Sequence, residues 1–470
     1  MGRFIYNLSP DTFTAANLSN NRPFGYLLAP NNASPQLVEL AGQVRGAGLA
    51  LMADNGNFAF IGKVRGALRE RAAVLREHLV RVEDDLGRSV RAGEVPEDVQ
   101  KSFLGLSVEA RELARQLASN GESSLGEQVA LGPTHLIGVE DITAACWLAL
   151  DLERVYMGRR SRDWRRMNES VARRASRRLR DLPASVRSSY YPVASAESYN
   201  TAYDAGVAFA AQGVARVSMG FGAYMADANY RDYVVIRRRR IDFAGRLPNR
   251  YTRTVLVARG FWDGYRAISG GAPAAFHCLG LGAPIMLPLV ALVAGGATEL
   301  SFDATSPIKD ALRDGILYVT TPAYMKIRIR RSAGWLASDA TRTWDCPCAF
   351  CRAFAKKFPF NYAIGHAWRA ANPDREPKAA DLREGGALYE AYPLFSEPPG
   401  GPRRDAVDHA RIGHNHWAIE QILGAVSCAA GIAALASHVE RVVDDYAATT
   451  TPPFAQAVAQ GLAFALDPKL

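Results

Sequence analysis

The chain has 470 residues, 48% of them hydrophobic and 22% charged, a composition that excludes a largely disordered protein. This length exceeds the size at which a single core usually stops growing, so we expect one large catalytic body with appended elements. The 56 basic residues outnumber the 47 acidic ones and give a net charge of +9, which favours a polyanionic partner.

The apolar runs predict no contact with a membrane. The longest, at residues 284–294 and 425–436, are too short to span a bilayer, and the first residues lack the apolar stretch of a secretion signal. We therefore expect a cytoplasmic protein. In that compartment, clustered cysteines indicate a metal site or catalysis more than a disulfide framework.

Six short, nearly continuous apolar runs end in a polar residue or a glycine, as buried parallel strands do when helices separate them. In chain order they are residues 25–30, 48–54, 134–141, 254–260, 275–282 and 298–304. This repeat predicts an α/β fold, either a doubly wound sheet or a (β/α)8 TIM barrel. Acids at the ends of three runs are Asp54, Glu140, Asp141 and Asp303. They favour the barrel, in which the carboxyl ends of all strands share one face.

Long helices are predicted between these runs. Residues 66–117 carry Leu, Val, Arg and Glu at helical spacing, with a break at 93–96, and residues 148–182 form a second helical stretch. About a hundred residues separate the third run from the fourth, far more than a barrel crossover needs. We therefore predict a basic, mostly helical insertion at about 152–250, with an alanine-rich helix near 201–217.

The stretch WDCPCAFC at residues 344–351 holds half of the six cysteines in a C-x-C-x-x-C run. Thiolates at this spacing can converge on one ion, so the run predicts a structural zinc site. A tetrahedral zinc needs a fourth ligand, and the histidines His409, His414 and His416 are the only cluster that can supply it. The alternative is three unrelated buried thiols.

The C-terminal part is expected to form a separate subdomain. We predict an exposed loop at 373–404, a long helix at about 406–445 and a short helix after residue 449. The predicted organisation is a barrel over residues 1–335, and a zinc-binding subdomain with C-terminal helices over residues 336–470, packed on the barrel.

Two aspartates are the candidate catalytic groups. Asp303 in FDATSP can act as a nucleophile or a base, although an aspartate at a strand end is often only a helix cap. Asp54 in ADNGNF could share its pocket and divide the acid and nucleophile roles with it, although turn chemistry alone also explains that segment. The GLG at 280–282 favours the close approach of a planar base.

Three basic clusters predict nucleic-acid binding, with solvated surface as the alternative. They lie at residues 159–180, 237–240 and 326–331. Trp164, Tyr190 and Tyr191 lie near the first cluster in the sequence and are expected to be available for stacking on bases.

From about residue 45 to residue 425, these motifs resemble the tRNA-guanine transglycosylase superfamily. That family is a (β/α)8 barrel whose C-x-C-x-x-C zinc motif is completed by the histidine of an HN pair. The matching metal ligands are Cys346, Cys348, Cys351 and His414. The family's nucleophile stands in an FD-x-x-x-P segment, which the residues around Asp303 match, and its other essential aspartate opens a DSGGF turn, which is similar to residues 54–58.

The resemblance also implies the residues that hold the base. The family's FDE-x-T context is similar to VEDIT, so Glu140 or Asp141 would read the guanine edge. The expected substrate-binding residues on the matching GGLA-like and VQGG segments are Gly280, Leu281, Gly282, Arg259 and Gly260. Asp303 would attack C1′ of the target nucleoside, Asp54 would handle protons or position the base, and the nucleotide would be flipped out or unpaired.

Several departures make the chain more similar to the DNA-modifying branch, whose members exchange guanine in DNA for a 7-deazaguanine such as preQ0. DSGG has become DNGN, and Arg259 replaces the glutamine of VQGG. The gap from Cys351 to His414 is long, and the predicted insertion is basic. The expected partners are DNA and a 7-deazaguanine base, with a helper ATPase as a further candidate. The alternatives are the same exchange on tRNA, and a non-catalytic, zinc-stabilised nucleic-acid-binding protein.

Overall fold

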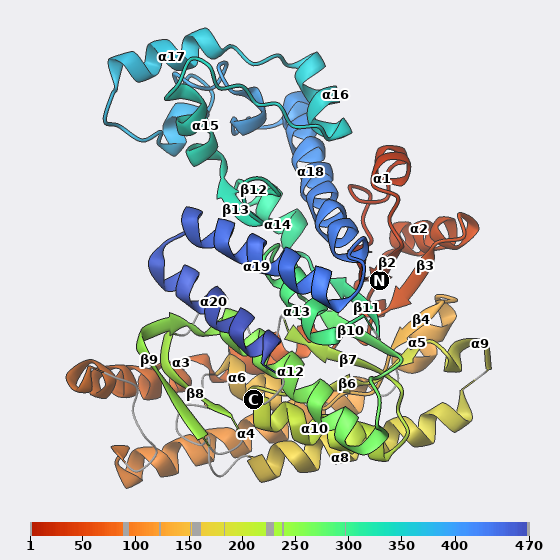
Figure 1. Cartoon of the computed structure of the whole chain (residues 1–470). Helices are drawn as coiled ribbons and strands as arrows, with labels where there is room; N and C mark the ends of the chain where they lie inside the picture. Colours follow the sequence, from red (N-terminus) through yellow and green to blue (C-terminus); the bar gives the residue numbers. More distant parts are fainter. Residues whose placement is uncertain are drawn as a thin grey trace.

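The centre of the molecule is one parallel sheet (Figure 1). The computed structural model describes residues 2–87, 94–121, 124–150, 152, 161–182, 184–221, 230–236, 239–296 and 298–467. Nine strands of these residues pair in the order β5-β4-β3-β2-β1-β11-β10-β7-β6. They are β1 Gly2–Asn7, β2 Gly25–Leu28, β3 Ala50–Ala53, β4 His135–Ile137, β5 Tyr190–Tyr191, β6 Val193–Ala194, β7 Arg216–Gly220, β10 Ala275–Leu279 and β11 Glu299–Asp303.

The sheet nearly closes on itself and is barrel-like. Its two ends are β5 and β6, which only Pro192 separates in the chain. One face of the strands encloses a small apolar interior of Ile5, Leu27, Met52, Ile137, Tyr191, Val193 and Ala275. Alternate residues such as Phe4 and Phe276 join the larger core under the helices. Because all the strands are parallel, their carboxyl ends meet at one end of this interior.

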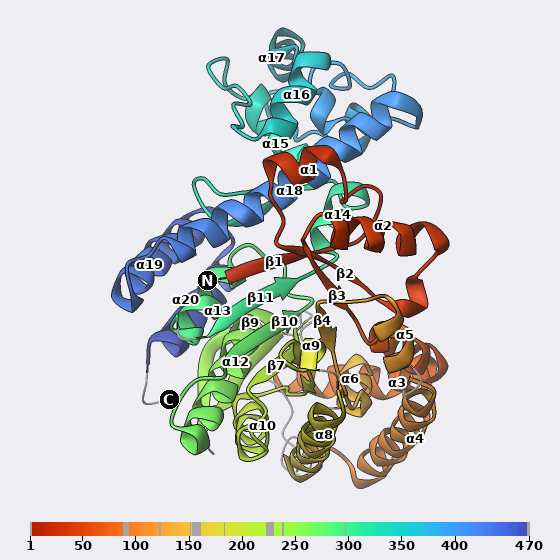
Figure 2. The same cartoon turned by 90° about the vertical axis from the view of Figure 1, so that its right-hand side faces the viewer.

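Helices cover the outside of the sheet, as Figure 2 shows for α3, α4, α8, α10 and α12. The described helices up to residue 312 are α1 Ala15–Asn20, α2 Pro35–Gly46, α3 Asn57–Leu86, α4 Glu97–Gly121, α5 Ser124–Ala130, α6 Thr143–Ala149, α8 Ser161–Asp181, α9 Ala184–Arg187, α10 Tyr199–Ala211, α12 Asn249–Ser269, α13 Met286–Ala294 and α14 Ser306–Leu312, together with the 3-10 turn η1 Pro30–Asn32. An antiparallel ribbon of β8 Tyr230–Ile236 and β9 Arg239–Pro248 precedes α12.

A second, smaller core lies above the sheet in Figures 1 and 2, where α15, α16 and α17 gather. We call residues 316–410 the C-terminal lobe. The elements from residue 316 onward are β12 Ile316–Val319, β13 Met325–Arg328, α15 Ile329–Ala337, α16 Ala349–Lys357, α17 Tyr362–Ala371, η3 Ala379–Leu382, η4 Pro393–Phe395, α18 Gly401–Ser427, α19 Ile432–Thr449 and α20 Pro452–Leu466. The long helix α18 begins in the lobe and ends against β1, so it joins the two cores.

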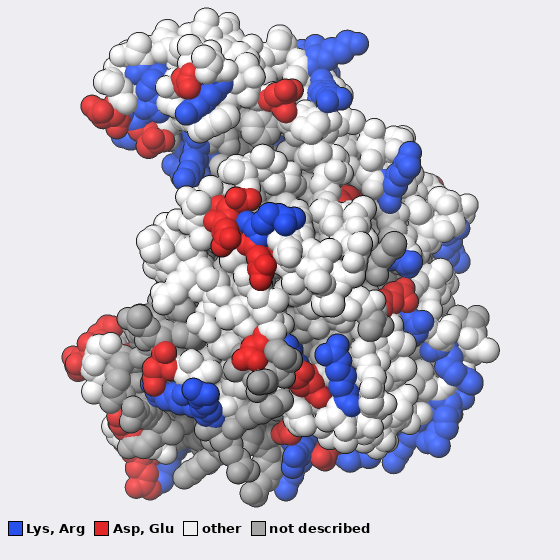
Figure 3. Space-filling model, in the orientation of Figure 1, with Lys and Arg blue, Asp and Glu red and all other residues white. Residues whose placement is uncertain are grey.

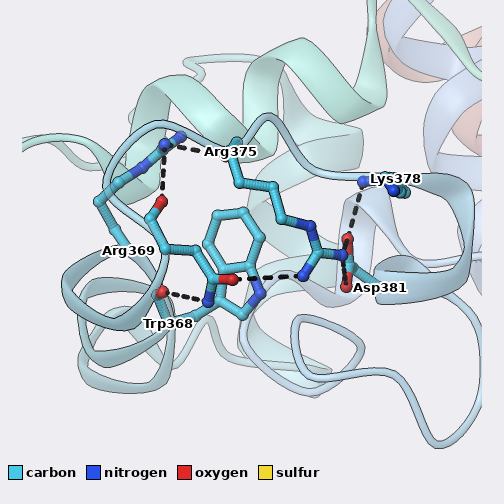
Figure 4. A network of polar contacts seen from close by, with 6 residues as sticks. Trp368, Arg369, Arg375, Lys378 and Asp381 are labelled. Atoms are coloured by element: carbon cyan, nitrogen blue, oxygen red, sulfur yellow. Dashed lines mark hydrogen bonds and ion pairs between the residues drawn. The ribbon is translucent and has the colours of Figure 1, made fainter.

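The lobe is folded by polar contacts as well as by its core (Figure 4). Arg375 donates to both oxygens of Asp381, at 2.8 and 2.7 Å, and the Lys378 N–H donates to the same carboxylate at 2.7 Å. The guanidinium groups of Arg369 and Arg375 lie over the Trp368 ring. The prediction of an exposed loop at 373–404 is therefore only partly right, because the segment is irregular but internally bonded, contributes apolar residues to the lobe core, and ends within α18.

Five of the six predicted strands are confirmed. The sixth, predicted at residues 254–260, is wrong because these residues lie within α12. Residues 251–262 of this helix are almost all buried, since α12 packs between α10, α13 and α20. A helix that is buried on all sides shows the same continuous apolar run as an interior strand.

Two further predictions about the elements are wrong. Residues 152–250 are not a helical insertion, because they supply β5, β6 and β7 to the main sheet. The single helix predicted at 406–445 is two helices, α18 and α19, that break at Gly431, whose φ is +95°. The break between α3 and α4 and the short helix after residue 449 are confirmed. Among the described residues, no helix combines the length and apolarity that a membrane crossing needs.

Candidate functional site

Three of the predicted acids meet at the carboxyl end of the sheet. Asp303 is the last residue of β11, Asp54 directly follows β3, and Glu140 lies just beyond β4. The charge of Asp303 helps to raise the pKa of Asp54, and the charge of Asp54 helps to raise the pKa of Glu140. These charge interactions agree with the expectation that the strand ends bring the carboxylates together.

Asp303 is 7% exposed, and one of its oxygens is held by the loop that follows β10. The backbone N–H of Gly280 donates to Oδ1 at 3.1 Å. Gly280 has a φ of +72°, which a residue with a side chain rarely adopts, and a Cβ on Gly282 would lie 2.6 Å from that of Ala304. Together with the buried Leu281, these glycines let the loop lie against the strand of Asp303.

The environment of Asp54 favours its protonated form. Burial is the larger cause and the charge of Asp303 is the second, and together they raise the pKa of Asp54 to about 6. The backbone N–H of Asn55 donates to its Oδ1 at 2.9 Å, which opposes the shift in part. A carboxyl group that titrates near neutral pH can both donate and accept a proton during a reaction.

Glu140 is held by two amide side chains from the turn that follows Asp54. Asn55 Nδ2 donates to Glu140 Oε2 at 3.2 Å and Asn57 Nδ2 donates to the same oxygen at 3.0 Å. Gly56 between them has a φ of +72°, which lets the turn bring both amides to one carboxylate. Burial is the main cause that raises the pKa of Glu140 to about 7.

Glu140 and Asp141 have different hydrogen-bond partners. Asp141 Oδ1 accepts from the N–H of Thr143 at 3.0 Å, and so it caps the start of α6. Of the two acids proposed to read a base, the one held beside Asp54 is Glu140.

Arg259 and Gly260 are not part of this acidic cluster. Both lie on α12 and are buried, and Arg259 donates to Asp263 at 2.9 Å and to the Ala465 carbonyl of α20 at 3.2 Å. A Cβ on Gly260 would overlap the Tyr199 carbonyl, so this glycine serves the close packing of α12 on α10. The expectation that both residues line the substrate pocket is therefore wrong.

The raised pKa values predict a pH dependence of stability. Between about pH 4.5 and 7, folded Glu140 keeps a proton that the unfolded chain has released, so stability decreases as the pH rises through this window. Glu140→Gln cannot ionise, and its oxygen can still accept from both asparagines. The free energy of unfolding of the variant minus that of wild type should therefore be larger at pH 8 than at pH 5. We expect this increase to be at most about 3 kcal/mol. Urea unfolding at both values measures this, and equal differences at the two pH values would contradict it.

The three clustered cysteines converge with His414. Their sulfurs lie 3.3, 3.5 and 3.5 Å from His414 Nδ1, for Cys346, Cys348 and Cys351 in that order. All four ligand atoms lie within 4.8 Å of one another. A tetrahedral ion at about 2.3 Å from sulfur and about 2.0 Å from nitrogen separates those atoms by about 3.5 Å, so the four residues fit a metal.

The surroundings of His414 suit a ligand. Its Nε2 donates to the Tyr318 carbonyl at 2.8 Å, which leaves Nδ1 unprotonated and directed at the sulfurs. Of the other two candidate histidines, His416 stacks on Tyr6 with ring centroids 4.1 Å apart, and His409 packs on Phe350. Among the described residues, neither belongs to the cluster.

The residue after His414 connects the metal cluster to the acids. Asn415 is fully buried, and its Nδ2 donates to the carbonyls of Pro307 at 3.0 Å and Ile316 at 3.1 Å. Its Oδ1 accepts from the Tyr318 N–H at 2.9 Å. Pro307 lies four residues after Asp303, so the helix that carries the metal ligand also fixes the segment that follows the candidate nucleophile.

The first basic cluster is a surface of α8. Its exposed members among the described side chains are Arg165, Arg166, Arg173, Arg177 and Arg180. Lys and Arg side chains gather where α8 and α9 lie along the lower right of Figure 3. On the same helix, Arg174 donates to the Glu140 carbonyl at 3.3 Å, so α8 passes beside the acidic cluster. Residues 159–160 lie outside the described residues.

The other basic clusters also carry exposed arginines, Arg239 in the second and Arg328 and Arg331 in the third. Residues 237 and 238 of the second lie outside the described residues, and Arg240 pairs with Asp242. In the third, Lys326 is paired with Asp310 at 2.6 Å. The expectation that Trp164, Tyr190 and Tyr191 stack on bases is wrong, because all three are at most 2% exposed and belong to the core.

The chain matches no protein-family model and no curated protein. What can be inferred about its function therefore rests on the residues of this site and on the motifs in the sequence.

Proposed function

We propose that the protein is a base-exchange transglycosylase that replaces guanine in DNA with a 7-deazaguanine such as preQ0. The observation that carries this proposal is the meeting of Asp303, Asp54 and Glu140 at one end of the sheet, at the positions that the family resemblance assigns to the nucleophile, the proton-handling group and the base reader. An enzyme that passes through a covalent intermediate needs such a nucleophile beside a carboxyl group that can move a proton.

The proposed reaction has two halves. In the first, a carboxylate oxygen of Asp303 bonds to C1′ as the bond from C1′ to N9 breaks, and guanine leaves with a proton from Asp54. In the second, the incoming base gives its N9 proton to Asp54, N9 bonds to C1′, and Asp303 is released as a carboxylate. The pKa of Asp54, raised to about 6, suits a group that must donate and then accept.

Glu140 would bind the polar edge of the base. Guanine presents N–H donors on that edge, and a carboxylate accepts from them. Both asparagine amides donate to Glu140 Oε2, which leaves Oε1 to accept from the base. A duplex cannot present this edge and C1′ together, so the target nucleotide would be flipped out of the stack.

The fold supports the same proposal. If β5 and β6 are counted as one strand interrupted at Pro192, the sheet has eight strand positions, the number in a (β/α)8 barrel. The metal cluster would hold zinc, because three thiolates and one imidazole in a tetrahedral arrangement are typical of structural zinc sites. Zinc there would bind Cys346, Cys348, Cys351 and His414, and would supply structure alone.

The basic surface of α8 would hold the nucleic-acid backbone. We expect the double variant Arg173→Gln with Arg177→Gln to bind DNA more weakly, because it removes two exposed charges from the helix whose Arg174 contacts the Glu140 carbonyl. The slope of log affinity against log salt should fall by about one for each phosphate contact removed. Fluorescence anisotropy with a labelled hairpin over a salt series measures this.

The matched control for that variant is Arg441→Gln, an exposed arginine on α19. It should leave both the affinity and the salt slope unchanged. Equal salt slopes for the double variant and wild type would remove α8 from the interface.

The proposed function is tested by incubating the full chain with radiolabelled preQ0 and either plasmid DNA or bulk tRNA. We expect label to enter DNA. Incorporation into tRNA alone would show that the enzyme performs the same base exchange on tRNA and not on DNA. No incorporation into either would favour the non-catalytic, nucleic-acid-binding alternative.

A further inference from the structure

The buried imidazole of His277 contacts the side chain to which we assign the nucleophilic role. His277 lies on β10 and pairs in register with Ser301 of β11. Its Nδ1 lies 2.8 Å from Ser301 Oγ, and its Nε2 lies 3.2 Å from Asp303 Oδ1. Ser301 and Asp303 are two residues apart on one strand, so both point to the same side of the sheet, where the ring lies.

The neighbours of the two ring nitrogens indicate which of them carries the proton. A carboxylate only accepts hydrogen bonds, so the Nε2 that faces Asp303 is the protonated nitrogen. Nδ1 then accepts from the hydroxyl of Ser301. The contact from Nε2 to Oδ1 is within ion-pair distance but does not have the geometry of a hydrogen bond. Catalytic hydrogen bonds are often imperfectly aligned before the substrate binds.

The two oxygens of Asp303 therefore differ. Oδ1 faces two donors, the Gly280 N–H at 3.1 Å and the His277 Nε2 at 3.2 Å. In the described part of the chain, Oδ2 has no hydrogen-bond donor. An oxygen that is not engaged by donors keeps its lone pairs for a bond to carbon.

We propose that His277 is a positioning residue that, with the Gly280 N–H, fixes Oδ1 and leaves Oδ2 of Asp303 as the oxygen that bonds to C1′. This inference rests on the proposed base exchange. In the first half, the bond from Oδ2 to C1′ forms as C1′ loses N9, and Oδ1 becomes the ester carbonyl oxygen. In the second half, N9 of the new base displaces Oδ2 and the electron pair returns to the carboxylate. His277 keeps its proton throughout, and its donor stabilises the departing carboxylate.

The test compares His277→Phe with His277→Gln in the full chain. Phenylalanine keeps a planar ring and removes both nitrogens, whereas glutamine keeps an N–H near the position of Nε2. We expect His277→Phe to lower kcat for preQ0 exchange about 100-fold with little change in KM for DNA, because the nucleophile is bound but misplaced. His277→Gln should recover at least about tenfold of that loss, since it restores a donor.

A wild-type kcat in His277→Phe, or a change confined to KM, would overturn the inference while base exchange itself stands. Absence of exchange in wild type would instead overturn the proposed function. A readout that does not depend on activity is the ¹⁵N spectrum of histidine-labelled protein, in which the His277 signal is the one missing from His277→Phe. A protonated Nε2 whose shift changes in Asp303→Asn supports the inference, and an unprotonated Nε2 contradicts it.

Discussion

The Asp303→Asn variant is expected to lose base exchange by about four orders of magnitude or more. An amide oxygen cannot form the ester that the proposed reaction needs, yet asparagine has nearly the same shape and can still accept from the Gly280 N–H. The fold should therefore survive. Incorporation of radiolabelled preQ0 into DNA measures the loss, and circular dichroism with metal analysis checks that the protein remains folded and loaded.

The control for Asp303→Asn lies on the same strand. Glu299 begins β11 at the opposite end of the barrel-like sheet, where it pairs with Arg3 at 3.2 Å and Arg216 at 3.3 Å. Glu299→Gln makes the same chemical change far from the acidic cluster and should keep most of the exchange activity. Exchange by Asp303→Asn at the rate of this control would remove Asp303 from the mechanism.

The second large effect is expected from loss of the metal. Cys351→Ser removes a ligand that is buried in the C-terminal lobe, and it should abolish metal binding and destabilise the lobe by about 5 kcal/mol or more. Exchange activity should fall as well, because Asn415 ties the metal-bearing helix to Pro307 beyond the nucleophile. Mass spectrometric metal analysis and scanning calorimetry measure the two direct effects.

Cys428→Ser is the matched control, because Cys428 is exposed and lies outside the metal cluster. It should keep full metal content and the wild-type unfolding midpoint. Among the histidine variants, His414→Ala should lose the metal, whereas His409→Ala and His416→Ala should retain it. Full metal content in both Cys351→Ser and His414→Ala would contradict the assigned ligand set.

The acids and the metal ligands could be predicted because their signals are local. Asp54 and Asp303 each end a short apolar run, and parallel strands bring such ends together whatever the intervening chain does. The spacing of Cys346, Cys348 and Cys351 restricts them to one small volume in the same way. The choice of His414 among three histidines followed from the family motif, and packing of the other two against aromatic rings agrees with it.

Elements of the sheet that lack a continuous apolar run could not be predicted. β7 contains Arg216 and Ser218, whose side chains donate hydrogen bonds to Tyr191. Its sequence therefore lacks the continuous apolar run that predicts a buried strand. β5 and β6 have two residues each and are interrupted at Pro192. The wrong prediction of a strand within α12 has the opposite reason, because only Thr254 and Arg259 are polar in the run at 254–260, too few to show a helical period.

The positioning residues of the site were missed because their role depends on register. His277 is a lone histidine in an apolar run, and only its pairing with Ser301 places it beside Asp303. Asn55 and Asn57 suit a turn, and their second role depends on where Glu140 lies after β4. Two amides that flank a glycine next to a candidate acid were the one local signal available for this part of the site.

The central claim is that Asp303 forms a bond to the sugar of the target nucleotide. Intact-mass spectrometry of the full chain, incubated with a guanine-containing DNA hairpin and no incoming base, tests it most directly. We predict an adduct with the mass of protein plus DNA minus guanine, located by proteolysis to the peptide that contains Asp303 and absent from Asp303→Asn. An adduct on another residue, or preQ0 exchange by Asp303→Asn at the wild-type rate, would contradict the claim.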